Sequence, residues 1–169
     1  MLSHAVKSYF DNNKSVQLKV ICLDDLASGT ASAGTITLSG TATNSGTLNI
    51  YIDGKSYKTV VSSGDTASTI ATALNTTINN DDEALVTCNV NSAVVTLTAT
   101  HKGTFGNTIK IIENYNSDEI TPSGITASIV DMSAGAGNPD LSTFVISNLE
   151  ENQYNLITHP YTDNTTLNI

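Results

Sequence analysis

The chain has 169 residues, which is enough for one domain or two small domains with a buried core. It contains seven Lys, no Arg and sixteen acidic residues, for a net charge of −9. Proteins that bind nucleic acids or anionic membranes use Lys and Arg to neutralise phosphates, so this balance argues against both kinds of partner. No apolar run approaches the ~20 residues needed to cross a bilayer. We therefore expect an acidic, soluble chain.

The N-terminal part has the pattern of one helix followed by one strand. Leu2, Val6 and Phe10 recur at four-residue steps, which predicts a helix with one buried face over residues 2–10. The apolar run at 16–23 then predicts a strand that is covered on both faces in a parallel sheet.

The C-terminal part has a similar pattern. Asn138-Pro139-Asp140 is typical of a helix start, so we expect a helix over 139–149 and a strand over 154–158. Neither end can bury a core alone, so we expect them to form one α/β unit that is interrupted by the residues between them. A further helix start follows Tyr161, but the chain stops at Ile169. We therefore expect the chain to be a fragment of a longer protein.

Between these parts lies a Thr-, Ser- and Gly-rich block with the two-residue alternation of β-strands. Thr accounts for 25 of the 169 residues and is concentrated in the alternating runs, where a β-branched polar side chain suits the solvent-facing side. Asp53-Gly54 is a strong signal for a two-residue hairpin turn, and Tyr57, Thr59 and Val61 alternate on the return strand.

One predicted helix interrupts the strands of the block. Asp65 is its expected N-cap, and Asn79-Asn80-Asp81-Asp82 ends it. Its apolar stripe consists of Ala67, Ile70, Ala71, Leu74 and Ile78. A later turn is expected at Asn91-Ser92. The strands are expected around 35–38, 47–52, 57–61, 86–90, 95–99, 109–111 and 125–129. The block thus predicts about seven strands and one helix, an α+β domain that resembles a sandwich.

The predicted fold class is therefore α/β plus α+β. Residues 1–28 and 135–169 are expected to form a split helix–strand core, and residues 29–134 an inserted Thr-rich domain with one helix. Residues 133–137 are expected to be a flexible return to the core. Gly135-Ala136-Gly137 could also cradle a phosphate, but it lacks a third glycine and a nearby Lys or Arg, so a hinge between domains is favoured.

Other candidate sites have plainer interpretations. Asp24-Asp25 at a strand end could belong to a catalytic site, but no Gly-x-Ser-x-Gly element accompanies it, and His101 and His159 lie in unsuitable contexts. Solvated carboxylates are therefore favoured. Residues 81–83 (Asp-Asp-Glu) lack the alternate spacing and the glycine of a calcium loop, which favours a solvated turn.

The two cysteines, Cys22 and Cys88, lie in predicted strands and are expected to be buried thiols without a disulfide. Together with the three scattered His, they give no zinc-type spacing. The sequence therefore indicates no catalytic, cofactor-binding or metal-binding residues and no enzyme.

The order of several short motifs resembles that of a known family. Within the block these motifs are GTITLSGTA (34–42), GTLNIYIDG (46–54), GDTA (64–67), VTLTA (95–99) and HKGTFGN (101–107). Outside it they are LDD (23–25), GAGNPD (135–140) and PYTD (160–163). In this order, and over essentially the whole chain, the sequence is similar to the tail sheath proteins of Mu-like bacteriophages with contractile tails.

This resemblance implies a structural subunit that polymerises helically around a tail tube and contracts to drive the tube through a bacterial envelope. It implies a subtilisin-like topology for the split core without protease activity. The implied partners are other sheath subunits, the tail tube and the baseplate, and the implied location is the virion tail, assembled in the host cytoplasm. Because sheath proteins are much longer, the chain would be a middle section with an outward-facing block, monomeric by itself.

Two other functional classes stay open. A carbohydrate-binding or adhesin-type β module can share the Thr-, Ser- and Asn-rich composition, although an aromatic content of 5% without Trp argues against an aromatic platform. A hydrolase built on the α/β core is the other alternative, and mutation of Asp24 would distinguish it, because a sheath subunit has no activity to lose.

Overall fold

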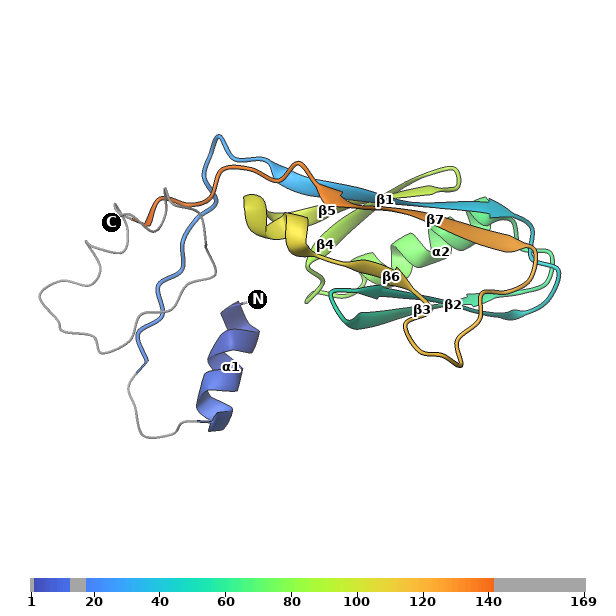
Figure 1. Cartoon of the computed structure of the whole chain (residues 1–169), viewed down its shortest axis with the longest axis horizontal. Helices are drawn as coiled ribbons and strands as arrows, with labels where there is room; N and C mark the ends of the chain where they lie inside the picture. The colour runs from blue at the N-terminus through green and yellow to red at the C-terminus, as the bar shows by residue number, and fades with distance from the viewer. Residues whose placement is uncertain (1, 13–17, 142–169) are drawn as a thin grey trace, which may run out of the picture.

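A computed structural model describes residues 2–12 and 18–141, and its main body is built of two antiparallel sheets with a helix between them (Figure 1). The helices are α1 (Leu2–Asn12) and α2 (Ala67–Asn79), with a 3-10 turn, η1 (Thr104–Thr108). The strands are β1 (Ala31–Gly40), β2 (Gly46–Ile52), β3 (Lys55–Val61), β4 (Val86–Asn91), β5 (Val94–Lys102), β6 (Ile111–Glu113) and β7 (Ile125–Ser133). The fold class is therefore mixed α+β. The seven strands and the helix predicted between residues 29 and 134 are all present.

The larger sheet has the strand order β4-β5-β1-β7, and the smaller has the order β3-β2-β6. Every pairing is antiparallel. Antiparallel sheets can face a core on one side and solvent on the other, which is why the sequence alternates so clearly. In β1, for example, Ile36 and Leu38 are buried, whereas Thr35 and Thr37 lie on the opposite face.

The predicted hairpin joins β2 to β3. Asp53 and Gly54 have φ angles of 49° and 84°, and two consecutive positive φ values are the mark of the type I′ turn that this dipeptide favours. On β3 the buried side chains are Tyr57, Thr59 and Val61, as the alternation predicts.

Helix α2 fills the space between the sheets. Its five predicted stripe residues are all buried, and the helix contacts β1, β3, β4 and β5. Its predicted N-cap is wrong by one residue. The hydroxyl of Thr66 accepts the N–H of Thr69, while the Asp65 carboxylate accepts the N–H of Ser62 and so stabilises the preceding turn.

Two further boundaries differ from the prediction. The turn between β4 and β5 falls at Ser92-Ala93, because Asn91 still pairs with Val94 and the positive φ of 56° is at Ser92. Strand β6 begins at Ile111, whereas Ile109 follows η1 and is buried outside any strand.

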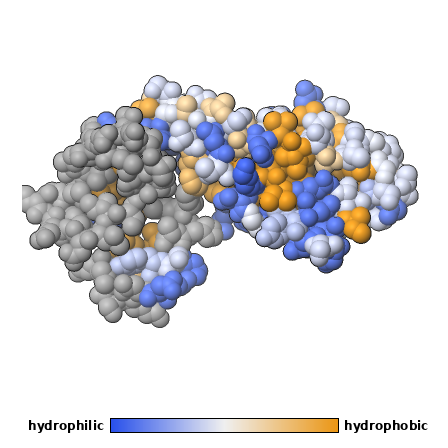
Figure 2. Space-filling view, in the orientation of Figure 1, coloured by the Kyte–Doolittle hydropathy of each residue, from blue (hydrophilic) through white to orange (hydrophobic). Residues whose placement is uncertain are grey.

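The core lies between the sheets and around α2. Its fully buried large side chains come from both sheets and the helix: Ile36, Leu38, Leu48, Ile50, Val61, Ile70, Leu74, Ile78, Val86, Val95 and Leu97. Burial of each such side chain contributes about 1.5–3 kcal/mol. Helix α2 lies against β3 and β4, which are edge strands on one side of the block. On the other side, β6 and β7 are the edges. Ile112 on β6 and Val130 on β7 are exposed there, and Figure 2 shows an apolar band on the visible face of the block.

The segment before the block differs from its prediction. Residues 18–23, expected to lie in a buried parallel strand, form no strand, and Leu18 and Val20 are 37% and 40% exposed. A strand exists only where a neighbour pairs with it, and none pairs with this segment in the described residues. Cys22 is likewise exposed rather than buried.

Helix α1 forms as predicted, but Phe10, expected on its buried face, is 48% exposed. In Figure 1, α1 lies apart from the two sheets, so neither sheet covers that face. The predicted helix at 139–149 extends beyond the described residues, and the predicted strand at 154–158 lies outside them. None of the described helices has the length and apolar character needed to cross a membrane.

Candidate functional site

The chain enters and leaves the two-sheet block side by side, at a point that we call the neck (residues 25–30, 101–107 and 134–138). The N–H of Thr30 donates to the carbonyl of Ala136 over 2.7 Å, and the N–H of Ala136 donates back to the carbonyl of Thr30 over 3.0 Å. Strands β1 and β7, which follow and precede these residues, are also paired along their length (Figure 1). The block is therefore closed by its own first and last strands.

Glycines allow the two chain segments to approach this closely. A Cβ added to Gly29 would lie 2.8 Å from the carbonyl oxygen of Gly137, and one added to Gly135 would lie 2.4 Å from that of Gly103. Both distances are below normal van der Waals contact. Gly137 also has a φ of 77°, which side chains with a Cβ rarely adopt.

Two asparagines fasten the neck from opposite sides. The Asn107 side-chain amide donates to the carbonyl of Gly135 over 2.9 Å and accepts the N–H of the same residue over 2.8 Å. The Asn138 side-chain oxygen accepts both the N–H of Thr104, at 2.8 Å, and its hydroxyl, at 3.1 Å. The HKGTFGN and GAGNPD motifs, which the sequence keeps about 30 residues apart, thus form one hydrogen-bonded unit.

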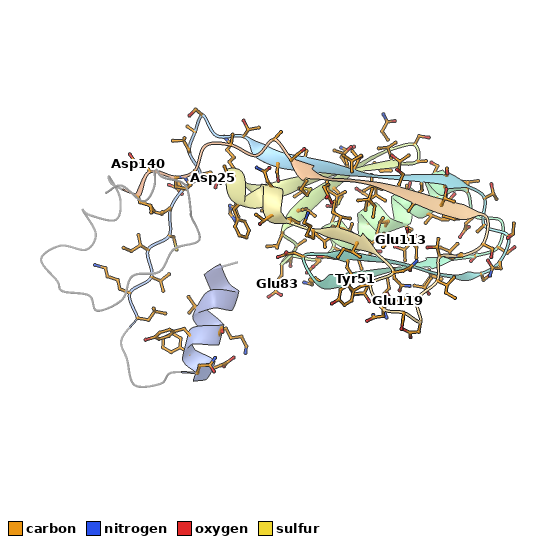
Figure 3. All side chains as sticks on the ribbon, in the orientation of Figure 1. Asp25, Tyr51, Glu83, Glu113, Glu119 and Asp140 are labelled. Carbon is orange, nitrogen blue, oxygen red and sulfur yellow. The ribbon has the colours of Figure 1, made fainter. Side chains whose placement is uncertain are left out.

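Asp25 holds the incoming segment against the same unit. Its carboxylate accepts the N–H of Lys102 at 2.9 Å, and the Lys102 ammonium donates to the carbonyl of Ala27 at 2.8 Å. His101 Nδ1 lies 3.6 Å from the other Asp25 oxygen. Asp25 is exposed, as predicted for a solvated carboxylate, but it is also a structural hydrogen-bond acceptor. Figure 3 shows its place where the chain meets the block. Asp24 is exposed.

The neck also corrects the prediction of a flexible return at residues 133–137. Gly135 and Ala136 each have their N–H and carbonyl bonded to the opposite side of the neck. In a flexible linker, these N–H and carbonyl groups would be hydrogen-bonded to water instead. Sequence reasoning missed this because glycines next to small residues are typical both of flexible linkers and of closely packed backbones.

The neck does not assemble the groups of a nucleophilic site. His101 is 72% exposed, and within the described ranges no serine or cysteine is hydrogen-bonded to it. His159 lies outside those ranges. Across the described part of the chain, no three metal-ligating side chains come together. What the arrangement can do is mechanical: it holds two antiparallel chain segments together at the base of a closed domain.

The predicted acidic turn at residues 81–83 is present, but Asp81 is not simply solvated. Its carboxylate accepts the Tyr57 hydroxyl at 2.6 Å and the Lys55 ammonium at 2.8 Å, and so ties the end of α2 to β3. The hydrogen bonds from Lys55 and Tyr57 lower the pKa of Asp81. Burial, followed by the bond to Asp81, raises the pKa of Tyr57 above its ordinary value.

The loop between β6 and β7 bears on the alternative of a carbohydrate-binding module. Tyr115 is 68% exposed, and its ring lies 5.6 Å from that of Tyr51. The polar groups beside it hold the loop together: Glu119 accepts from Tyr51 and Asn116, and Asn116 also donates to the Tyr51 hydroxyl (Figure 3). The hydrogen bond from Tyr51 lowers the pKa of Glu119. This single exposed ring offers only a small stacking surface for a sugar, and the polar groups beside it are already hydrogen-bonded to one another. The loop therefore gives little support to a carbohydrate-binding module.

Comparison with known proteins tests the resemblance that the motif order predicts. No protein-family model matches the chain. The chain is 40% identical over 168 residues to the Mu-like prophage FluMu tail sheath protein of Haemophilus influenzae. The resemblance predicted from the motifs is confirmed. The alignment covers 99% of this chain and 34% of that protein, so the chain spans about a third of the relative's length.

Proposed function

We propose that this chain is part of a structural subunit of a contractile tail sheath, which polymerises helically around a tail tube and contracts to drive it through a bacterial envelope. The observation that carries the proposal is the 40% identity to a tail sheath protein over 99% of the chain. Its partners would be other sheath subunits, the tail tube and the baseplate, and it would reside in the virion tail after assembly in the host cytoplasm.

Within that subunit, residues 29–134 would form an inserted domain. Residues 1–28 and 135–169 would belong to a split core of subtilisin-like topology without protease activity. The closed neck supports this division, because a domain inserted into another chain segment must begin and end at neighbouring points. The many exposed polar positions of the strands suit a domain on the outer surface of a tube. A sheath works by re-docking discrete bodies, which requires no active site.

Electron microscopy of the longer protein that contains this chain tests the proposal. We expect negatively stained long hollow tubes built of stacked rings of identical subunits. Tubes should still form when residues 30–136 are replaced by a short Gly-Ser linker, because the paired neck leaves both cut ends adjacent. Dispersed particles from the intact protein would contradict the sheath role. Loss of tubes only in the shortened variant would contradict the assignment of the block as an insert.

A further inference from the structure

The four edge strands of the two sheets differ in how they are protected against pairing with a further strand. Natural edge strands are commonly protected by charges, especially Lys, or by being short. Strand β3 carries Lys55 and Lys58, and β6 is three residues long and includes Glu113. Strand β7 carries Asp131, which lies 3.5 Å from the ammonium group of Lys110. Each of these edges has one of the usual protections.

Strand β4 has none of them. Its sequence, Val-Thr-Cys-Asn-Val-Asn, contains no charged residue and no proline. It is the outer strand of the larger sheet, and among the described residues it pairs with β5 alone. A neutral strand rich in β-branched residues, exposed at an edge, is a typical site for strand addition.

A single side chain occupies the middle of this edge. The Asn79 amide, at the end of α2, donates to the carbonyl of Cys88 over 2.8 Å and accepts the Cys88 N–H over 2.8 Å. In an antiparallel strand, both backbone groups of alternate residues point to the same side. Cys88 therefore presents its groups away from β5, toward the position that an additional strand would take. Asn79 makes the two bonds that a residue of that strand would make.

We propose that the β4 edge is a latent strand-addition site for a second copy of this chain, and that Asn79 keeps it closed. The occupant is the β4 strand of the other copy, paired antiparallel across a two-fold axis. Neutrality favours this partner: the chain carries a net charge of −9, but the edge itself carries none, so two copies can approach here without like charges meeting. The acidic residues 81–83 precede the strand, so antiparallel pairing places the two acidic turns at opposite ends.

This inference does not rest on the proposed function, because it concerns one edge of the block whatever the whole protein does. It does give the block a property that any crowded assembly of copies would need. Strands of identical sequence held near one another pair readily when their edges are open. A side chain from the same block that occupies the edge prevents this without adding charge.

The test is sedimentation velocity on the complete 169-residue chain and three variants over a range of concentrations. In Asn79→Ala the edge is open, and we expect the self-association constant to rise by about tenfold or more over that of the wild type. Asn75→Ala is the matched control, because Asn75 lies one turn earlier on α2 and accepts a hydrogen bond from Asn79, and among the described residues it has no hydrogen bond to β4. It should sediment like the wild type.

The third variant separates an open edge from a damaged fold. Asn89 is exposed on β4, and in a two-fold antiparallel pair lysines at this position lie near each other, so Asn79→Ala combined with Asn89→Lys should return to the wild-type association constant. Hydrogen exchange should show faster exchange of the Cys88 amide in dilute Asn79→Ala and renewed protection as copies associate. The proposal is overturned if Asn79→Ala associates no more than the wild type, or if its association persists in the double variant.

Discussion

The two-sheet block and the segment that leads into it have similar apolar content but different structures. Residues 46–52 and residues 18–26 both contain closely spaced Leu, Ile or Val, yet the first form a central strand with buried side chains and the second pair with no strand. The difference is the presence of partners. Strand β2 is paired on both sides by β3 and β6, whereas residues 18–26 have no pairing strand in the described part of the chain. An apolar run specifies what a segment can bury, and its neighbours decide whether it does.

The largest difference in stability between the two regions is expected from a matched pair of Leu→Ala substitutions. Leu74 on α2 is fully buried between the sheets, so Leu74→Ala removes buried methyl groups and leaves a cavity. We expect the free energy of unfolding in urea to fall by about 3 kcal/mol. Leu18→Ala, in the leading segment, should change it by less than about 0.5 kcal/mol. Equal losses would show that the leading segment is packed as tightly as the block.

The neck should give the next largest effect. Asn107→Ala removes both side-chain bonds to Gly135 and leaves a backbone N–H and carbonyl without these partners. We expect a loss of about 2 kcal/mol in urea denaturation. Asn89→Ala, on the exposed face of β4, should cost less than about 0.5 kcal/mol and serves as the matched control. A neutral Asn107→Ala would indicate that β1–β7 pairing alone closes the block.

A smaller effect is expected where α2 is tied to β3. Tyr57→Phe removes the hydroxyl that donates to Asp81, and we expect a loss of about 1.5 kcal/mol at neutral pH, because the bond is to a carboxylate. Tyr115→Phe, in the exposed loop, should be close to neutral. Chemical denaturation of both variants beside the wild type measures the difference.

The same bond predicts a pH dependence with two limits. The folded pKa of Tyr57 is raised, so its contribution is complete below the unfolded value of about 10 and is lost as pH rises through the folded pKa. The folded pKa of Asp81 is lowered, so its contribution is complete above the unfolded value of about 4 and is lost as pH falls through the folded pKa. The stability difference between the wild type and Tyr57→Phe should therefore be widest between these limits. A difference that does not change across the whole range would contradict the assignment.

The sequence predicted the parts of the fold that depend on local pattern. The alternation on β3, the turn at Asp53-Gly54 and the α2 stripe around Leu74 each follow from a periodicity or a dipeptide that has one physical solution. The errors within the block are small shifts. Asp65 and Thr66 are both good N-caps, but Asp65 bonds to the N–H of Ser62, whereas Thr66, which is bridged to Thr41, caps the helix.

The neck could not be predicted, because its contacts join residues that are far apart in the sequence. Nothing local in HKGTFGN indicates that Asn107 bonds to Gly135, or that Asp25 accepts the N–H of Lys102. The available signal was that the motifs on both sides of the neck belong to the set whose order resembles that of tail sheath proteins. Asn79 was missed for a similar reason, since an asparagine at a helix end is typical of a simple helix stop.

The central claim is that the block is closed on itself through the neck and folds without the segments outside it. Expression of residues 25–138 alone tests this claim most directly, with amide NMR spectra and urea denaturation compared with those of the 169-residue chain. The account predicts that block resonances coincide in the two spectra and that the free energies of unfolding agree within about 1 kcal/mol. Poorly dispersed amide resonances in the NMR spectrum, together with urea denaturation that shows no cooperative transition, would contradict it.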